Sequence, residues 1–365
     1  MVKVVFAPDS FKGSINALRA AQELARGWSC VREQDELVLA PMADGGEGTL
    51  EAVRSAHEDS QFMPIVVHGP DGQAVDTSWL LVRSEAGDTG VVELSRTSGL
   101  TLLSTPLPRD AHTIGCGEAI GAALDGGVSR IVVALGGSSS SDGGVGILSA
   151  LGARFLDAGG QEIMPGNRGV AAIVAVDLSA LHPLPREGVT VLTDVTNPLL
   201  GPLGTVAVFG PQKGAQTEEL RAMEESLIHF ARVTGGDAQQ PGSGAAGGAG
   251  YGLALWGAQL VSGAAFIAEA IGLASTLADA DWVITGEGKF DNQSSDGKVA
   301  THVQGIADRL GVSTALVAGL IDAESRDFNH AVSLTQLAGS SALAMEAPEY
   351  WLQKAGQQLA KFADQ

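Results

Sequence analysis

The chain has 365 residues, 45% of them hydrophobic, which is enough apolar material for large buried cores and favours two domains over one. Its 42 acidic and 22 basic residues give a formal net charge of −20, and such a surface repels phosphate backbones and anionic membranes. Composition therefore argues against a nucleic-acid or membrane partner.

Two cysteines, Cys30 and Cys116, are too few for a disulfide framework and lack metal-ligand spacing, as in proteins of a reducing compartment. The apolar run at residues 2–7 is too short and too lightly charged in front for a signal peptide, and no run approaches the length of a membrane span. We expect a cytoplasmic protein, as a monomer or homodimer.

The first 61 residues alternate between strand and helix patterns. Residues 2–7 and 36–42 predict buried strands, and residues 15–28 and 49–56 carry apolar side chains near helical spacing. Ser14 is the expected N-cap of the first helix. Alternation of this kind is typical of a parallel sheet covered by helices.

The pattern changes near residue 62. Three strand patterns separated by turns predict an antiparallel meander, at residues 63–69, 77–85 and 91–95. The following segments predict a helix ending near Leu124, a strand at 130–135, a helix at 146–155, and strands at 189–195 and 205–210.

Strand and helix alternate again from residue 281, with strands predicted at 281–285 and 313–319 and helices at 297–311 and 347–362. We therefore expect an α/β fold in which residues 1–61 and 279–365 share one doubly wound sheet. Residues 62–278 form a second α/β domain inserted into the first. Two contiguous domains are the alternative.

Six polar, glycine-rich segments follow the predicted strands or join elements. They are APDSFKGS (7–14), ADGGEG (43–48), GGSSSSDGG (136–144), TDVTNPLLGP (193–202), FGPQKGA (209–215) with the tract at 242–252, and GEGKFDNQSSDGK (286–298). Loops at the carboxyl ends of parallel strands meet at one edge of the sheet, so these predict a large polar site that spans the cleft between the domains. The tract at 242–252, taken alone, is typical of a flexible linker.

The segment GGSSSSDGG is the best candidate for a phosphate cradle. Its glycines let the backbone approach an anion, while its amides, its hydroxyls and the following helix N-terminus favour negative charge. An ordinary mobile loop has the same composition. The chain contains no P-loop motif, no G-x-G-x-x-G that follows a predicted strand in a dinucleotide arrangement, and no protein-kinase signature, so any ATP site has an uncommon architecture.

Phosphoryl transfer needs cations near the developing charge and carboxylates for Mg²⁺. The loops supply both types: Lys12, Lys213, Lys289 and Lys298, with Asp9, Asp44, Glu47, Asp142, Asp194, Glu287, Asp291 and Asp296. Any one of them could equally be a solvated surface charge. The histidines lack the spacing of a zinc site, and no nucleophile elbow surrounds Ser10 or Ser138, which weakens a hydrolase interpretation.

Together these segments resemble the class I glycerate kinases, whose motifs run APDSFKG, P-x-ADGGEG, GGSATNDGG, DVxNPLxGxxGA, FGPQKGA, GAAGGxG and GEGxxDxQ…GK. Here the same order reads APDSFKG, PMADGGEG, GGSSSSDGG, DVTNPLLGPLGT, FGPQKGA, GAAGGAG and GEGKFDNQSSDGK, across nearly the whole chain. Ser139, Ser140 and Ser141 replace Ala-Thr-Asn of the family pattern, and Thr205 replaces an alanine. The first change affects fine nucleotide contacts, not the reaction.

The resemblance implies an ATP-dependent glycerate kinase that phosphorylates D-glycerate with Mg²⁺, most often at the 2-hydroxyl, in the cleft between two three-layer α/β domains. It also implies that a flavodoxin-like parallel-sheet domain is interrupted by a mixed-sheet domain. This agrees with the insertion expected from the returning alternation.

Roles follow from motif position. The nucleotide phosphates are placed on Gly136, Gly137, Ser138 and Ser139, and Mg²⁺ on Asp194, with Asp142 or Asp44 as a second carboxylate. Lys12 and Lys213 are expected at the glycerate carboxylate and the transferring phosphoryl group. The base that orients the hydroxyl is Glu47, Asp44 or Glu287, which the sequence does not rank. Further expected substrate contacts are Asp9, Ser10, Asp291 and Lys298, the last of which could equally be a surface residue.

Three alternatives stay open at this point. A kinase for another small hydroxy acid or polyol would use the same loops, and a non-catalytic sensor would bind ATP without releasing ADP. A dehydrogenase on a doubly wound sheet fits poorly, because both the dinucleotide fingerprint and a clear catalytic histidine are missing from the sequence.

Overall fold

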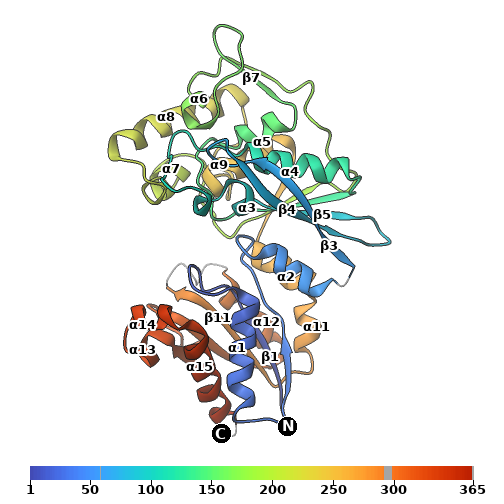
Figure 1. The fold of residues 1–365 in the computed structure, drawn as a ribbon, viewed down its shortest axis with the longest axis vertical. Coiled ribbons are helices and arrows are strands. Elements are labelled where there is room, and N and C mark those ends of the chain that lie inside the picture. Colours follow the sequence, from blue (N-terminus) through green and yellow to red (C-terminus); the bar gives the residue numbers. More distant parts are fainter. Residues whose placement is uncertain (58, 292–297, 364–365) are drawn as a thin grey trace. The chain divides into compact units, whose positions relative to one another are not determined.

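The computed structural model describes residues 1–57, 59–291 and 298–363, and these form two compact units. Unit 1 contains residues 1–44, 51–57, 262–291 and 298–363, and unit 2 contains residues 45–50 and 59–261. The chain thus leaves the first unit and later returns to it (Figure 1). Each unit is an α/β structure built on its own sheet, which confirms the predicted fold class.

Unit 1 is built on a five-stranded sheet with strands in the order β2-β1-β11-β12-β13, and every neighbouring pair is parallel. This is the strand order of flavodoxin-like sheets. Its strands are β1 (Lys3–Pro8), β2 (Glu36–Leu39), β11 (Trp282–Phe290), β12 (Ser313–Ile321) and β13 (His330–Ser333). Its helices are α1 (Ala17–Ser29), the part of α2 (Thr49–Ala56) from Glu51 onward, α10 (Gly263–Ala270), α11 (Leu273–Leu277), α12 (Val299–Leu310), α13 (Leu334–Ala338), α14 (Ser341–Glu346) and α15 (Pro348–Phe362).

Helices cover both faces of this sheet. Ala315 and Val317 of β12 pack in a core with α1 and α15, whereas Leu316 and Ala318 pack in a second core with Ala300 of α12. Successive side chains of a strand point to opposite faces, so a strand buried on both sides reads as a continuous apolar run. That is the pattern that predicted these strands from the sequence.

Unit 2 is built on a mixed sheet with strands in the order β10-β9-β6-β5-β4-β3. These strands are β3 (Ser60–His68), β4 (Ala74–Val82), β5 (Thr89–Glu93), β6 (Arg130–Ala134), β9 (Val189–Leu192) and β10 (Gln259–Val261). The pairs β3–β4 and β4–β5 are antiparallel, which confirms the predicted meander, and the remaining pairs are parallel. A small two-stranded sheet joins β7 (Arg154–Leu156) to β8 (Ala175–Asp177).

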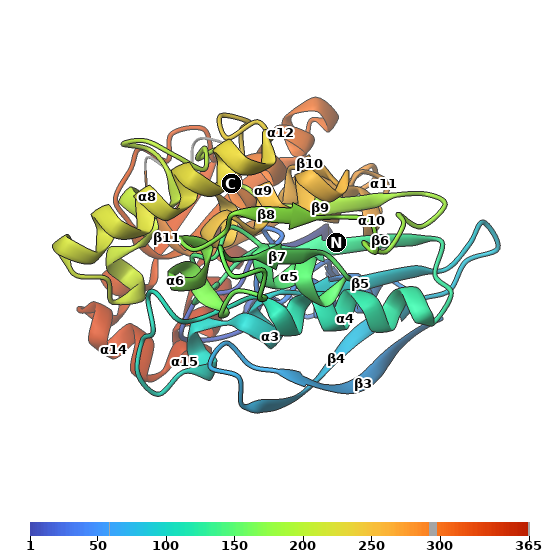
Figure 2. The same cartoon turned by 90° about the horizontal axis from the view of Figure 1, so that it is seen from above.

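Helix α4 (Ile114–Asp125) lies along β5 and β6 (Figure 2). The other helices of unit 2 are α3 (Ser95–Ser98), α5 (Val145–Ala150), α6 (Gly166–Val170), α7 (Thr205–Phe209), α8 (Thr217–Thr234) and α9 (Ala245–Trp256), with 3-10 turns at Leu100–Leu102 and Pro211–Lys213. One large apolar core, which includes Ile120, Val133 and Phe230, unites these elements.

Residues 262–278 belong to a different unit from the domain in which the sequence analysis placed them. The sequence put them in the inserted domain, but α10 and α11 contact α12 and group with unit 1. Residues 45–50, expected in the first domain, group with unit 2. The division into folding domains at 61/62 and 278/279 stays a prediction.

Three element predictions are wrong. Residues 205–210, expected as a strand because they are rich in Thr, Val and Phe, form α7, which packs between α8 and α9. The helix expected at 146–155 is shorter, because α5 ends at Ala150 and β7 follows it. Strand β11 extends beyond the predicted end at residue 285, since Gly286, Glu287 and Lys289 continue the pairing with β12.

Candidate active site

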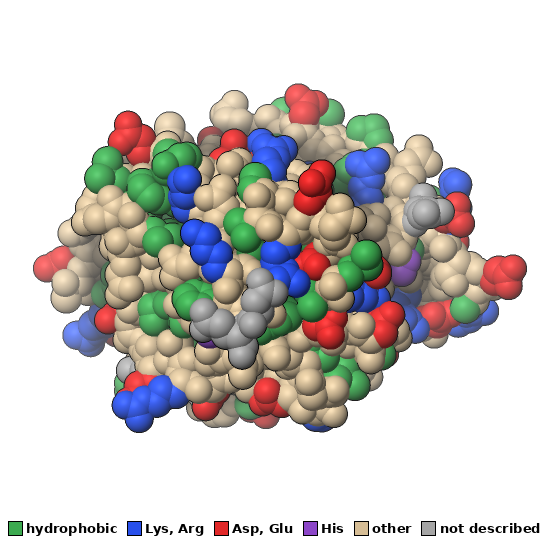
Figure 3. All heavy atoms as spheres, turned by 90° about the horizontal axis from the view of Figure 1, so that it is seen from below, with side chains coloured by type: hydrophobic (Ala, Val, Ile, Leu, Met, Phe, Trp, Pro, Cys, Tyr) green, Lys and Arg blue, Asp and Glu red, His purple; other side chains and the backbone are tan. Residues whose placement is uncertain are grey.

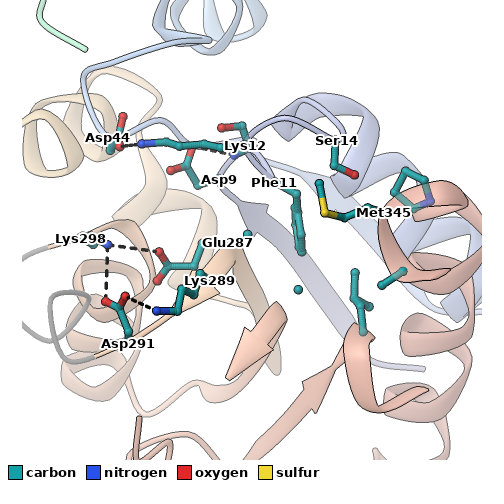
Figure 4. Close-up of a pocket in the computed structure, with 16 residues that line it drawn as sticks. Asp9, Phe11, Lys12, Ser14, Asp44, Glu287, Lys289, Asp291, Lys298 and Met345 are labelled. Atoms are coloured by element: carbon teal, nitrogen blue, oxygen red, sulfur yellow. Dashed lines mark hydrogen bonds and ion pairs between the residues drawn. The ribbon is translucent and has the colours of Figure 1, made fainter. Parts of the chain in front are cut away.

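The predicted site residues fall into two groups, one in each unit. The group in unit 1 lies where β1 and β11 run side by side, which is where the order of strands along the sheet reverses. Ligands of open parallel sheets bind beyond the carboxyl ends of the strands at such a point. A pocket of about 400 Å³ opens there, and the predicted residues that line it are Asp9, Ser10, Lys12, Asp44, Glu287, Lys289, Asp291 and Lys298 (Figure 4).

Lys12 and Asp44 form an ion pair at this pocket. Lys12 Nζ lies 2.7 Å from Asp44 Oδ2, and the Lys12 side chain is 64% exposed. The charge of Asp44 raises the pKa of Lys12 above its ordinary value, so the ammonium persists throughout the neutral range. Lys12 therefore presents a permanent positive charge to a ligand.

Asp9 is a buried carboxyl group beside this ion pair. Its backbone amide donates to the Gly286 carbonyl at 2.8 Å, which extends the pairing of β1 with β11 and fixes the residue at the strand end. Its Oδ1 accepts a 2.6 Å hydrogen bond from the Ser10 amide. Burial raises the pKa of Asp9 well above its ordinary value, the charge of Asp44 adds to this, and the Lys12 ammonium opposes it.

A second charged set lines the pocket from β11 and the start of α12 (Figure 4). Lys298 Nζ lies 3.9 Å from Glu287 Oε2 and 4.0 Å from Asp291 Oδ1, while Lys289 Nζ lies 3.2 Å from Asp291 Oδ2. Motif positions 292–297, including the candidate Asp296, lie outside the described residues.

Sequence analysis did not find the apolar part of the lining. Phe11, Leu334 and Met345 also contact the pocket, together with Ala344 and Pro348. Only Phe11 lies within a recognised motif, and an apolar side chain gives no chemical signal that separates it from the core. The pocket thus has a charged part and an apolar part.

The group in unit 2 centres on the predicted phosphate cradle, residues 136–144, which lies between β6 and α5. We call these residues the serine loop. This loop is closely packed: Ser139 donates from its amide and its Oγ to the Ser98 carbonyl, at 3.0 and 2.9 Å, and Gly137 accepts from the Leu100 amide at 2.8 Å. A Cβ on Gly136 would lie 2.6 Å from Gly46 Cα, so only glycine allows this approach of the ADGGEG segment. Glu47 follows in that segment and is exposed.

Lys213 is a buried cation that reaches into this loop. It is 3% exposed, and its Nζ donates to the Ser140 carbonyl and, at 3.4 Å, to Ser138 Oγ. Burial lowers the pKa of Lys213 to about 8, and the charge of Asp142 opposes this shift. An ammonium held by neutral acceptors is suited to receive an anion.

Asp142 is fully buried and holds the loop together. Its Oδ2 accepts from the amide and hydroxyl of Thr113, at 2.9 and 2.8 Å, and from the Gly146 amide at 3.2 Å, while its Oδ1 accepts from the Gly144 amide at 3.1 Å. These four bonds stabilise the folded conformation of the loop.

Asp194 follows β9, the neighbour of β6 in the sheet. The Leu135 amide donates to the Leu192 carbonyl at 3.0 Å, so Asp194 and the serine loop leave the same sheet edge. Asp194 is half-buried. Within residues 1–57, 59–291 and 298–363, no group of three or more His, Cys, Asp or Glu side chains is arranged to hold a metal ion.

The tract at 242–252 is not a flexible linker. Most of it is buried as the beginning of α9, where Tyr251 is 1% exposed and stacks edge-on against Phe230. A Cβ on Gly252 would lie 2.8 Å from Gly144 Cα. The glycines of this tract therefore permit close packing against the serine loop, and composition alone does not separate that use from flexibility.

Comparison with known proteins places this geometry in a family. The model of the glycerate kinase family matches residues 4–364. The chain belongs to the glycerate kinase family. It is 40% identical to the glycerate kinase of Bacillus subtilis (strain 168), over 90% of this chain and 87% of that one. It is 38% identical to the glycerate 2-kinase of Escherichia coli (strain K12), over 87% of this chain and 85% of that one.

A solved structure from this family also matches the fold. A crystal structure from Salmonella typhimurium LT2, described as glycerate kinase 2, superimposes with a TM-score of 0.81 at 35% identity, covering 100% of this chain and 98% of that one. Family membership makes the protein a kinase. No helix in the described part of the chain has the length and apolar character needed to cross a membrane.

On the face of the molecule drawn in Figure 3, acidic and basic side chains are interspersed. On this face an anion would therefore be attracted by individual lysines and not by a broad basic surface.

Proposed function

We propose that the protein transfers the γ-phosphate of ATP to the 2-hydroxyl of D-glycerate and that it requires Mg²⁺. The observation that carries this proposal is the 38% identity, across 87% of the chain, to the E. coli protein named glycerate 2-kinase. The two groups of cationic and carboxylate side chains supply the types of residue that phosphoryl transfer needs.

Unit 2 is proposed to hold the triphosphate. Gly136, Gly137, Ser138 and Ser139 supply backbone and hydroxyl groups, and the Lys213 ammonium adds the local positive charge that an acidic protein otherwise lacks. Asp194 supports Mg²⁺ binding, because Mg²⁺ is commonly held by one or two carboxylates together with the phosphates themselves. Bound Mg²⁺ would neutralise charge on the transferring phosphoryl group.

Unit 1 is proposed to hold glycerate. Lys12 offers an exposed ammonium for the carboxylate, and Asp9, Ser10, Asp291 and Lys298 line the same pocket. Asp44 and Glu287 are the pocket carboxylates that can orient the hydroxyl, with Glu47 as a further candidate. A loose transition state asks little of a base, so we expect positioning and charge neutralisation to dominate.

The decisive experiment measures ADP release by the purified protein with Mg·ATP and D-glycerate, followed by ³¹P NMR of the product. Glycerate-dependent turnover that yields 2-phosphoglycerate supports the proposal. A product phosphorylated at the 3-hydroxyl would correct the regiochemistry. A panel of other small 2-hydroxy acids tests specificity, and a higher kcat/KM for one of them would replace glycerate as the substrate.

A further inference from the structure

Three consecutive residues at the start of α9 have left-handed backbone conformations. Ala246 has φ 50° and ψ 46°, followed by Gly247 at φ 72° and Gly248 at φ 88°. Throughout the described residues, Ala246 is the one non-glycine residue with a positive φ. This conformation is costly for an L-amino acid, so the surrounding structure must impose it, and such strain often marks functional sites. We call residues 246–248 the brace turn.

The brace turn packs directly against the serine loop. The Gly143 amide donates to the Gly247 carbonyl at 3.0 Å. A Cβ built on Gly247 would overlap the Ser140 carbonyl oxygen, and one on Gly248 would lie 2.8 Å from Gly143 Cα. The brace turn and the serine loop are thus in direct backbone contact, and neither glycine has space for a side chain.

The same Ser140 carbonyl accepts a hydrogen bond from Lys213 Nζ. Asn167, fully buried in α6, holds the next residue, because its Nδ2 donates to the Ser141 carbonyl at 2.9 Å. The conformation of residues 138–143 is thus fixed by the brace turn, Lys213 and Asn167. A shift of the Ser140 carbonyl would change the position of the Lys213 ammonium.

We propose that the brace turn is a positioning element for nucleotide binding. It sets the backbone of residues 138–143 and, through the Ser140 carbonyl, the Lys213 ammonium, in the geometry that receives the phosphates of ATP. This rests on the proposed function in one respect, since ATP is taken as the ligand of the loop. Ala246, Gly247 and Gly248 do not themselves act in the reaction.

The test compares Gly247→Ala with Gly152→Ala. Both glycines have positive φ, and at both a Cβ would overlap a backbone carbonyl oxygen, of Ser140 and of Ala180 respectively. Gly152 follows α5 and lies outside the serine loop. We expect both variants to lower the melting temperature, but only Gly247→Ala to raise the KM for ATP, at least tenfold. Its KM for glycerate should stay within twofold.

Equal KM values for ATP in the two variants would reduce the brace turn to a purely structural feature and overturn the proposal. Failure of the proposed function is distinct, because it shows in the unmodified protein as no glycerate-dependent ADP release.

Hydrogen exchange of the unmodified protein provides a second test that does not depend on the folding of Gly247→Ala. Because the Gly143 amide bonds to the Gly247 carbonyl, Mg·ADP should slow exchange in residues 136–144 and 244–250 together. Slower exchange in residues 136–144 with no change in 244–250 would contradict the proposal, as would no change in either segment at saturating Mg·ADP.

Discussion

Lys213 combines a positive charge with a site that disfavours that charge. Its Nζ is buried and contacts the Ser140 carbonyl and Ser138 Oγ, and burial lowers its pKa to about 8. Below pH 8 the side chain is an ammonium available to a phosphate. Above pH 8 it loses its proton in the nucleotide-free protein, so ATP binding there requires proton uptake.

We therefore expect kcat/KM for ATP to fall as pH rises through about 8, since this quantity reports the ionisation of the free enzyme. The substitution Lys213→Arg retains the charge at all these pH values and should move the alkaline limb upward, even if it lowers the maximum. Steady-state rates between pH 6 and 10 measure this. An alkaline limb that is unchanged in Lys213→Arg would assign the ionisation to another group.

The two carboxylates near the serine loop should respond differently to amidation. Asp142→Asn retains one acceptor oxygen, so either the Gly144 amide or the buried donors of Thr113 and Gly146 face an NH₂ group, and we expect a loss of about 2 kcal/mol or more in the free energy of unfolding. For Asp194→Asn the expected effect is on the metal, with the Mg²⁺ concentration for half-maximal rate raised at least tenfold. Denaturant unfolding measures the stability of both variants, and Mg²⁺ titrations of the rate measure their metal requirement. A raised Mg²⁺ requirement in Asp142→Asn but not in Asp194→Asn would make Asp142 the metal ligand.

Lys12 should matter for the reaction and little for the fold, because its side chain is largely exposed and its ion pair with Asp44 is at the pocket surface. Lys12→Ala is expected to lower kcat by two orders of magnitude or more, about 2.7 kcal/mol of transition-state stabilisation. Glu218→Ala, an exposed change on α8, serves as the control and should have no effect. Normal kcat/KM for glycerate in Lys12→Ala would remove this loop from the site.

At the scale of the elements, α1 shows how a helix start is chosen among neighbouring candidates. Ser14 was the predicted N-cap, but the helix begins later, and Asn16 Oδ1 accepts from the Arg19 amide at 2.8 Å. The Ser14 amide instead donates to the Phe11 carbonyl in the preceding turn. Both residues are good caps by type, so only the path of the loop decides between them.

Asn16→Ala should accordingly lower the free energy of unfolding of unit 1 by about 1 kcal/mol, the usual cost of a lost cap. Ser14→Ala should change it by less than about 0.5 kcal/mol, the range of ordinary surface changes. Thermal or denaturant unfolding of both variants measures this. A larger effect at Ser14 than at Asn16 would contradict the capping geometry.

At the scale of the whole molecule, a nucleotide that binds only the folded protein must stabilise it. With Mg·ADP at 100 times its dissociation constant, the free energy of unfolding should rise by about 2.7 kcal/mol. Thermal unfolding with increasing Mg·ADP should therefore show a rising midpoint, whereas Lys213→Met should need a much higher nucleotide concentration for the same rise. An unchanged midpoint in millimolar Mg·ADP would argue against nucleotide binding.

The strands and helices of unit 1 could be predicted because their apolar patterns report burial directly. Strand β12 packs into an apolar core on each face, and α12 packs its apolar side chains against the same sheet, as their apolar patterns predicted. The helix at 205–210 could not be predicted in this way, because Thr and Val favour a strand locally, whereas packing against α8 and α9 selects a helix.

For the site, the sequence by itself determined which loops are candidates, since seven motifs in family order carry information that no single residue does. Only the tertiary structure decided how individual side chains are placed there. It buried Asp142 among hydrogen-bond donors, buried the Lys213 side chain, and packed the 242–252 tract against the serine loop. The physical reason is that burial, pKa shifts and backbone contacts arise between segments far apart in the chain, whereas composition and spacing describe only neighbours along it.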